Sequence, residues 1–390
     1  MKLSKTITGL TGGGDDGWGL FYEARRRVAA GEPILQLTIG DHDIPTHPSI
    51  LEAMHASASG GNTGYALAPG VTALRDAVAK RVTKRTGVAT TIDNVLITPG
   101  GQAGLFATHK AVLDQGDTGL YLDPFYATYP GTIRGSGAEA RAIPCHAEDG
   151  FQPRAADIAA AATGAKSLLI NTPNNPTGVI YSRKTVEGIS EIVQEHDLWL
   201  ISDEVYDTQV WEGEHISPRM LPGMEERTLV VGSMSKSHAM TGSRVGWVIG
   251  PAHVIDHMIN LATHTTYGVP GYIQEAAVFA LNQGQRLEDE VGAPFARRRA
   301  IAEALLAKQN TVGLVPSGGA MYLMLDIRAT GRGGEVFARS LLDEEAIAVM
   351  PGESFGKAAE GHIRVAMTLE DTQFEDALSR LLRHAQAMAA

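Results

Sequence analysis

Short apolar runs alternate with longer amphipathic stretches through the middle of the chain, between about residues 94 and 250. The runs are rich in valine, isoleucine and leucine without strict alternation, which is typical of strands covered on both faces. They span residues 95–98, 118–122, 140–144, 167–170, 198–202, 229–232 and 245–249. Helical spacing of apolar positions appears between them, for example over 102–113 and 183–196. This alternation predicts an α/β domain with a mostly parallel sheet flanked by helices.

The pattern changes after residue 286, where long charged helical stretches alternate with only a few strands. Helices are predicted over 286–308, 334–344 and 369–389, and strands over 320–326 and 362–366. These elements suggest a smaller α+β domain, and the first 45 residues are too short to fold alone. We therefore expect a large domain over 46–285 and a small domain made of 1–45 together with 286–390.

Composition narrows the class of protein. With 390 residues, 44% hydrophobic and 20% charged, the chain is ordinary for a globular enzyme of two domains. A net charge of −11 argues against binding nucleic acid or an anionic membrane surface. No apolar run approaches the roughly 20 residues that span a bilayer. The single cysteine, Cys145, excludes an intrachain disulfide and suits a reducing compartment, so a buried thiol and a cytoplasmic location are expected.

The most informative residues follow two of the predicted strands. Asp203 ends the strand 198–202, at the carboxyl edge where open α/β sheets bind ligands, and Tyr206 comes three residues later. Lys236 follows the strand 229–232 within Ser233-Met234-Ser235-Lys236. Taken singly, the lysine reads as a solvated charge and the aspartate as a helix cap. Together they can hold a pyridine ring by its nitrogen, its phenolic oxygen and its aldehyde, which predicts pyridoxal 5'-phosphate bound as a lysine Schiff base.

A second group of residues could hold the phosphate of that cofactor. Gly100, Gly101 and Gln102 join a predicted strand to a helix, where glycines let backbone N–H groups face an anion. Such a turn alone is a weak signal, because any tight connection can use glycine. Two hydroxyl residues and an arginine would complete the phosphate site, namely Ser233, Ser235 and Arg244.

Two further positions point to the substrate and the ring. Asn175 lies in the turn-rich run 171–178, from which its amide could donate to the phenolic oxygen beside Tyr206. Arg364 lies within an apolar strand, where a cation is costly unless it is paired. The carboxylate of a bound substrate is the expected partner of Arg364.

These motifs, in this order, resemble the class I/II aminotransferases, the fold-type I pyridoxal-phosphate enzymes. The resemblance covers nearly the whole chain, from Leu37-Thr38-Ile39-Gly40 to Arg364. It implies that Lys236 forms the Schiff base and that Asp203 pairs with the ring nitrogen. The implied substrate-binding residues are Gly40, Asn175 and Arg364, with Arg364 and the backbone at Gly40 at the substrate carboxylate. The remaining implied cofactor contacts are Gly100, Gly101, Gln102, Asn175, Tyr206, Ser233, Ser235 and Arg244.

The resemblance adds two aromatic residues. Tyr126 is similar to the aromatic residue that stacks on the pyridine ring, where relatives often carry tryptophan. Tyr65 is similar to the tyrosine that reaches the phosphate of the neighbouring subunit. A homodimer with sites shared across its interface is therefore expected, and no metal ion is expected.

The chain departs from the family pattern in two ways. The usual Gly-x-Pro-Asp-Phe segment reads Gly40-Asp41-His42-Asp43-Ile44, so that His42 replaces a rigid proline. This histidine either tunes substrate choice or is a tolerated loop residue. No lysine or arginine occurs between Arg244 and Arg286, where aspartate-specific relatives place an arginine, and Gln102 replaces the lysine of another subgroup. A neutral or aromatic amino donor is accordingly preferred.

Three functions are compatible with these residues. The leading hypothesis is an aminotransferase that moves an amino group between an L-amino acid and a 2-oxo acid. A carbon–sulfur β-lyase would use nearly the same residues and remains the alternative. A non-enzymatic pyridoxal-phosphate-sensing domain is the third, but it would be joined to a basic winged-helix segment, and only about 30 residues precede Ile34.

Overall fold

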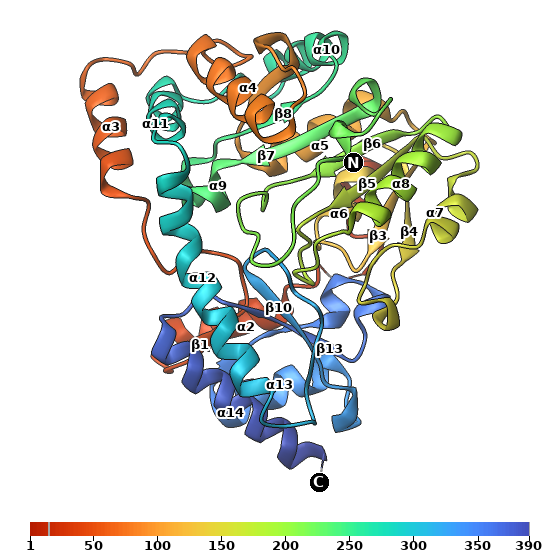
Figure 1. The fold of residues 1–390 in the computed structure, drawn as a ribbon, viewed down its shortest axis with the longest axis vertical. Coiled ribbons are helices and arrows are strands. Elements are labelled where there is room, and N and C mark those ends of the chain that lie inside the picture. The colour runs from red at the N-terminus through yellow and green to blue at the C-terminus, as the bar shows by residue number, and fades with distance from the viewer. Residues whose placement is uncertain (15, 390) are drawn as a thin grey trace.

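A computed structural model describes residues 1–14 and 16–389 of the chain. Its largest element is a seven-stranded sheet in the upper part of the molecule (Figure 1). The order of the strands across the sheet is β2-β8-β7-β6-β5-β3-β4. Their bounds are β2 Val95–Thr98, β3 Thr118–Asp123, β4 Glu139–Pro144, β5 Ser167–Asn171, β6 Trp199–Asp203, β7 Thr228–Ser233 and β8 Gly246–Ile249.

The predicted mostly parallel sheet is confirmed, with one reversed strand. Strand β8 is antiparallel to both of its neighbours, β2 and β7. The connection from β7 to β8 contains only the one-turn helix α9 (Met234–Ser237) and a 3-10 turn, so the chain returns without a crossover helix. In the parallel part, Asn171 at the end of β5 is in register with Asp203 at the end of β6.

Helices cover both faces of this sheet. Neighbouring residues of one strand enter different hydrophobic clusters: Val230 packs with Ile97, whereas Val231 packs with Leu96. This arrangement follows from the alternation of side chains along a strand and explains why the strands read as apolar throughout. The helices of this part are α3 Pro48–Ser59, α4 Thr72–Thr86, α5 Gly100–Val112, α6 Tyr129–Gly135, α7 Ala155–Ala162, α8 Arg183–Glu195, α10 Ala252–Thr263 and α11 Gly271–Asn282.

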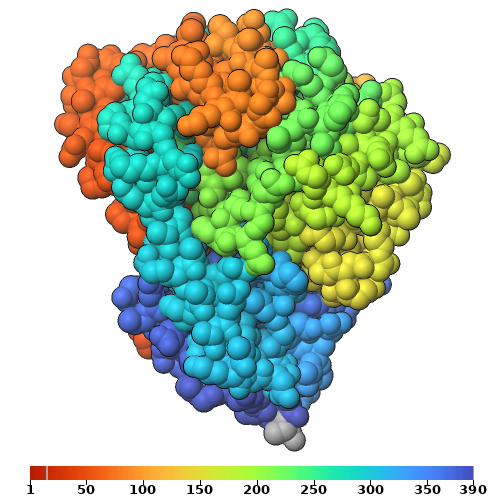
Figure 2. All heavy atoms as spheres, viewed as in Figure 1, coloured from red at the N-terminus to blue at the C-terminus, as the bar shows by residue number. Residues whose placement is uncertain are grey.

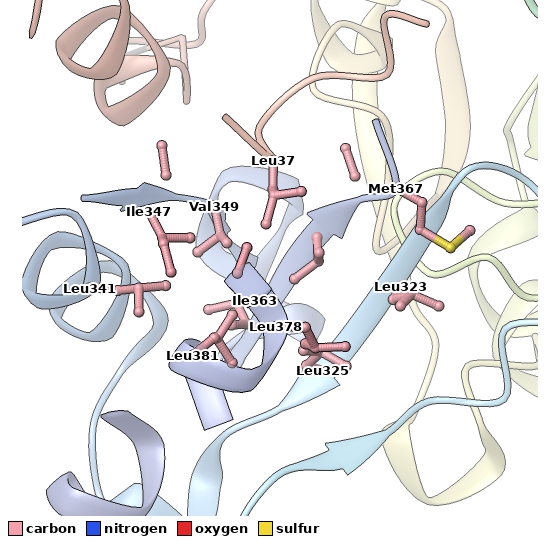
Figure 3. Close-up of a cluster of buried hydrophobic side chains, with 14 of the residues drawn as sticks. Leu37, Leu323, Leu325, Leu341, Ile347, Val349, Ile363, Met367, Leu378 and Leu381 are labelled. Atoms are coloured by element: carbon pink, nitrogen blue, oxygen red, sulfur yellow. The ribbon is translucent and has the colours of Figure 1, made fainter. Parts of the chain in front are cut away.

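The lower part of the molecule contains two smaller sheets. A four-stranded sheet has the order β12-β13-β10-β9, and β1 pairs with β11 in parallel. Side chains from this sheet and from the C-terminal helices form a buried apolar core, which includes Leu37, Leu323, Ile363 and Leu378 (Figure 3). The elements are α2 Gly19–Ala29, β1 Leu35–Gln36, β9 Gly313–Leu314, β10 Tyr322–Asp326, α13 Gly334–Glu345, β11 Ile347–Ala348, β12 Met350–Pro351, β13 His362–Ala366 and α14 Asp371–Ala389. The short helix α1 (Lys5–Thr8) lies instead in the upper part of the molecule, against α6 (Figure 1).

The long helix α12 (Gln285–Leu306) connects the two parts. In Figure 2 the cyan segment that includes it runs down one side of the molecule from the upper to the lower part. All strands of the large sheet lie within 46–285, and the smaller sheets draw on residues from both ends of the chain. The expected division, with boundaries at 45/46 and 285/286, stays a prediction.

Three further observations concern the described residues. Cys145 is buried directly after β4, as expected for a structural thiol. None of the described helices is long and apolar enough to cross a membrane. No group of three or more potential metal ligands occurs in residues 1–14 and 16–389.

Candidate active site

A cavity of about 330 Å³ lies at the carboxyl ends of the central strands, between the large sheet and the smaller one. Parallel strands bring their carboxyl ends to one edge, which is why residues far apart in the sequence meet there. Most of the residues predicted for the site line this cavity: Gly40, Gly101, Gln102, Tyr126, Asn175, Asp203, Tyr206, Ser233, Ser235, Lys236, Arg244 and Arg364.

Asp203 is the buried acid of the cavity. Its Oδ2 accepts a hydrogen bond of 2.7 Å from the hydroxyl of Tyr129, and its Oδ1 accepts one of 3.3 Å from the backbone of Val205. Burial raises the pKa of Asp203 to about 6, against the lowering effect of those two donors. A carboxyl group held this way is stabilised as an anion once a cation lies beside it.

Lys236 enters the cavity from the one-turn helix α9. Its Nζ donates to the backbone carbonyl of Gly40. Its own carbonyl oxygen lies 3.1 Å from Nε2 of His42 and 3.3 Å from Nε2 of Gln209. The amine of Lys236 thus points into the cavity, and the carbonyl group of Lys236 is held by hydrogen bonds from outside the cavity.

A site for an anion lies where α5 begins. The first residue of that helix, Gly100, has a φ of +79°, and a Cβ atom there would lie 2.5 Å from the guanidinium of Arg244. The conformation therefore favours glycine at this position, and a larger residue would displace the guanidinium of Arg244. Gly101 and Ser233 face each other across the same corner, and the hydroxyl of Ser233 accepts a hydrogen bond of 3.0 Å from the amide of Ser235. Backbone amides, hydroxyls and an arginine thus converge as a phosphate requires.

Arg364 on β13 is a buried cation that forms no ion pair within the described residues. The side chain is 1% exposed and lies between the rings of Tyr322 and Phe355, at 4.4 and 4.2 Å from their centroids. It donates to Oδ1 of Asn175 at 2.8 Å and to the carbonyl of Thr38. Its Nε has no hydrogen-bond partner in the described residues. Burial lowers the pKa of Arg364, so an anionic ligand at this point would relieve an unfavourable charge.

Aromatic side chains form the walls of the cavity. Tyr206 and Tyr322 share a hydrogen bond of 3.0 Å between their hydroxyls. The ring of Tyr126 packs edge-on against Tyr129 and Trp18. Burial raises the pKa of Tyr126 to about 12, so this phenol stays neutral over the working range of an enzyme.

Two predicted residues do not line the cavity. Gly100 lies next to the guanidinium of Arg244, which does line the cavity. Tyr65 is 93% exposed and packs its ring against Tyr267, at 5.3 Å between centroids. In a single chain Tyr65 has no role in the site, so its predicted contact with a neighbouring subunit stays a prediction.

Sequence reasoning missed several residues of the cavity. Tyr129 lies on α6 in a stretch without a strong pattern, and only the fold brings it to Asp203. Asn171, which ends β5, could have been found from its position one strand away from Asp203; its Nδ2 donates to the Asp203 carbonyl at 2.9 Å. The other missed residues include Trp18 and Tyr322.

A larger cavity of about 1260 Å³ adjoins the first and shares Trp18, Gln102 and Arg244 with it. Its walls are mostly apolar and aromatic and include Leu10, Phe106, Tyr121 and Phe125. Charged side chains of both signs also line it: Asp16, Glu335 and Glu353, and Arg134, Arg244 and Arg339. This space could accept the side chain of a ligand whose carboxylate is held at Arg364.

Comparison with known proteins identifies the family of the chain. The family model described as "Aminotransferase class I and II" matches residues 32–381. The arginine–pyruvate transaminase AruH of Pseudomonas aeruginosa is 39% identical over 383 residues, which cover 98% of this chain and 97% of that protein. The aspartate/prephenate aminotransferase of Thermus thermophilus is 34% identical, over 93% of this chain and 92% of that protein.

Solved structures agree with the sequence comparison. The aspartate aminotransferase of Thermus thermophilus with maleate superposes with a TM-score of 0.92 at 30% identity, covering 98% of this chain and 100% of the other. The aromatic aminotransferase of Pyrococcus horikoshii superposes with a TM-score of 0.88 at 30% identity, covering 93% and 99%. The chain therefore belongs to the class I and II aminotransferases, and it moves an amino group between an amino acid and a 2-oxo acid.

Proposed function

We propose that the cavity binds pyridoxal 5'-phosphate and that Lys236 holds it covalently. The observation that carries this proposal is the convergence of a buried acid, a lysine amine and an anion site on one cavity. When bound, the cofactor supplies an electron sink for the bonds at the substrate α-carbon. Each part of the cavity has a matching group: Asp203 for a protonated ring nitrogen, and the start of α5 with Arg244 for a phosphate.

The contacts proposed for the pyridine ring use polar groups of the cavity that are free to form hydrogen bonds. Asp203, supported by Tyr129, pairs with the ring nitrogen and keeps it protonated. Asn175 uses its Oδ1 to accept from Arg364, which leaves its Nδ2 to donate to the ring oxygen beside the hydroxyl of Tyr206. Tyr126 covers one face of the ring.

The substrate is held by its carboxylate at Arg364 and at the backbone of Gly40. A bidentate arginine fixes both the position and the plane of a carboxylate, which places the α-carbon toward Lys236. Lys236, when it is not bound to the cofactor, is the group that removes and returns the α-proton. The apolar walls around Arg364 exclude water from this step.

The residues that line the larger cavity indicate which amino donor would fit. Its apolar and aromatic walls support a neutral or aromatic side chain, as the sequence suggests. Arginine is the second candidate: the relative with 39% identity is an arginine–pyruvate transaminase, and Asp16 and Glu353 line the same cavity. Neither of these two carboxylates has an ion pair within the described residues; Asp16 accepts from Trp18 and Tyr22, and Glu353 from Gly334.

A panel of single amino acids mixed with the loaded enzyme tests both donors. The visible absorbance of the cofactor should be lost with donors that are accepted and should return on addition of pyruvate or 2-oxoglutarate. An arginine donor predicts that Asp16→Asn and Glu353→Gln raise KM for arginine at least fivefold and leave KM for phenylalanine unchanged. Absence of any change with the complete panel would contradict amino transfer.

The β-lyase alternative is tested in the same assay. A lyase would produce pyruvate and ammonia from cystathionine without any 2-oxo acid. An aminotransferase should instead stop after one turnover when no acceptor is present.

The role of Lys236 is tested by Lys236→Ala. This variant should bind the cofactor without the absorbance of the covalent lysine bond, and borohydride should no longer attach the cofactor to the protein. Lys166→Ala, at an exposed lysine outside the cavity, is the control. A covalent band that persists in Lys236→Ala would show that another amine carries the cofactor.

We also propose a homodimer in which Tyr65 reaches the phosphate of the partner's site. Its exposed ring, together with the exposed Leu67 and Tyr267, supports an interface on this side of the molecule. A cytoplasmic location stays a prediction, supported by the single buried cysteine.

A further inference from the structure

The side chain of His42 contacts the main chain of Lys236 and does not line the substrate cavity. It lines neither the smaller nor the larger cavity, although Gly40 and Asp41 line the smaller one. Its Nε2 lies 3.1 Å from the carbonyl oxygen of Lys236. Of the two roles considered for this residue, direct reading of the substrate therefore has no support in the geometry.

The protonation of His42 follows from this contact. A carbonyl oxygen only accepts hydrogen bonds, so Nε2 must carry the proton and donate. Nδ1 is buried and has no hydrogen-bond partner in the described residues. Burial and the nearby charge of Lys236 lower the pKa of His42 to about 4, so the ring is neutral and keeps one tautomer at the pH of most enzymes.

The ring of His42 is itself held in place. It packs edge-on against Phe295, at 5.5 Å between centroids, and Phe295 is fully buried on α12. The next residue, Asp43, forms a bidentate ion pair with Arg298 of the same helix, at 2.7 and 2.8 Å. The hydrogen-bond donor toward Lys236 is therefore anchored to the helix that joins the two parts of the molecule.

Segment 40–46 makes a row of contacts with the loop that carries Lys236. Gly40 accepts from Nζ of Lys236, and Asp41 accepts from the hydroxyl of Thr241 at 2.9 Å. Thr46 donates to the carbonyl of Ala239 at 2.6 Å. Within this row, His42 is the side chain that contacts the main chain of Lys236.

We propose that His42 is a positioning residue: its Nε2–H holds the carbonyl of Lys236 and thereby fixes the direction in which the lysine side chain enters the cavity. The inference rests on the proposed role of Lys236 as the cofactor-bearing amine. Proline, which the family resemblance places at this position, has no side-chain donor and could not make this contact. The hydrogen bond to the Lys236 carbonyl therefore depends on this chain having histidine at position 42.

Three variants at one position separate the hydrogen bond from simple space filling. His42→Phe keeps a ring against Phe295 but removes the donor, and His42→Pro removes both. His42→Gln retains an N–H donor of similar reach. In His42→Phe and His42→Pro, which lack the hydrogen-bond donor, kcat should fall about three- to tenfold, as expected for the loss of one neutral hydrogen bond. KM for the amino donor should change less than twofold in both variants.

Two readouts that do not depend on turnover accompany the kinetics. The rate at which the apoenzyme takes up pyridoxal phosphate should fall in His42→Phe and His42→Pro by a similar factor. The pH midpoint of the cofactor absorbance should move in both variants. His42→Gln should match the wild type within twofold in rate and in uptake.

The outcomes separate the alternatives. Wild-type kinetics and absorbance in His42→Phe would overturn the proposal, as would an equal loss in His42→Gln. A change confined to KM would indicate substrate reading instead. If His42→Phe does not fold, as judged by circular dichroism, His42→Pro and His42→Gln carry the comparison. Failure of the wild type to take up the cofactor would contradict the proposed function rather than the role of His42.

Discussion

At the scale of single residues, the site consists of polar groups that are costly to bury without a ligand. Asp203 and Arg364 are both nearly inaccessible, and the structure describes no residue of opposite charge in contact with either. Their environments move both pKa values toward the neutral forms. The free energy stored in these groups is recovered when the cofactor and substrate supply the opposite charges.

Asp203→Asn should stabilise the cofactor-free protein at neutral pH. The folded-state pKa of about 6 lies above the ordinary value of 3.8, so the contribution of this carboxyl to stability is largest below 3.8 and declines until about pH 6. Above pH 6 the variant should gain at most roughly 3 kcal/mol in free energy of unfolding. Urea titrations of both apoproteins between pH 4 and 8 measure this difference, which should shrink toward pH 4. A variant less stable than the wild type at pH 8 would contradict it.

Tyr129→Phe tests the support of the buried acid. Removing the 2.7 Å hydrogen bond raises the pKa of Asp203 further, because the lost donor stabilises the carboxylate. A hydrogen bond to a charged group contributes about 1.5–3 kcal/mol, so kcat/KM should fall roughly ten- to a hundredfold. Steady-state kinetics and the pH titration of the cofactor absorbance provide the measurement. Tyr272→Phe on α11 lies outside both cavities and should behave as the wild type.

At the scale of elements, the ends of strands and the start of one helix supply the chemistry. Strands β5 and β6 lie in register, so Asn171 and Asp203 end side by side. Helix α5 begins at the same edge and directs its first backbone amides to the corner occupied by Arg244. The first position of the helix has a left-handed conformation that favours glycine, and a larger residue there would displace the guanidinium of Arg244 from the corner.

Gly100→Ala should weaken phosphate binding more than it destabilises the fold. The substitution strains a backbone with φ of +79° and places a methyl group 2.5 Å from Arg244. Gly116→Ala is the matched control, because its φ is +92° but no atom lies within 4 Å of the new Cβ. Both variants should lose about 1–2 kcal/mol of stability. Only Gly100→Ala should bind pyridoxal phosphate about tenfold or more weakly, as measured by equilibrium titration of the apoenzyme; equal affinities of the two variants would refute the assignment of this corner.

At the scale of the whole molecule, the site lies between two parts of the chain, and a separate group of apolar side chains is exposed on the surface. Arg364 comes from strand β13 of the small sheet, Lys236 from helix α9 directly after strand β7 of the large sheet, and Gly40 from the segment between β1 and α3. The exposed ring of Tyr65 next to Tyr267 is unusual for a surface that faces water. A two-fold dimer would place this surface against its own copy.

A mixing experiment tests whether sites are shared across that dimer. Lys236→Ala should be inactive, and Tyr65→Ala should bind the cofactor weakly. In a mixed dimer, one site receives Lys236 from one chain and Tyr65 from the other and is intact. After unfolding and refolding an equal mixture, about a quarter of the wild-type activity should appear, because half of the dimers are mixed and each has one intact site. Activity no higher than the sum of the separate variants would exclude the shared site.

The sequence by itself determined the elements and the chemical type of the site. The apolar runs at 95–98 and 198–202 indicate strands that are buried on both faces of a sheet. This can be predicted without knowing which helices cover them. Asp203, Lys236 and Arg364 were found because a strand end, a hydroxyl-rich turn and an apolar strand each make a charged residue conspicuous. Their order along the chain resembles that of the class I/II aminotransferases, and this resemblance predicted that the three residues share one site.

Only the tertiary structure decided which side chains support them. Tyr129 lies 74 residues before Asp203 and gives no local signal, because its hydrogen bond depends on how the fold places α6, which packs against α5 and β4, relative to the end of β6. His42 looked like either a substrate contact or a neutral replacement, and its position behind Lys236 depends on a contact across 194 residues of sequence. Local patterns report whether a residue is buried, whereas the partner of a buried polar group is chosen by the packing of distant elements.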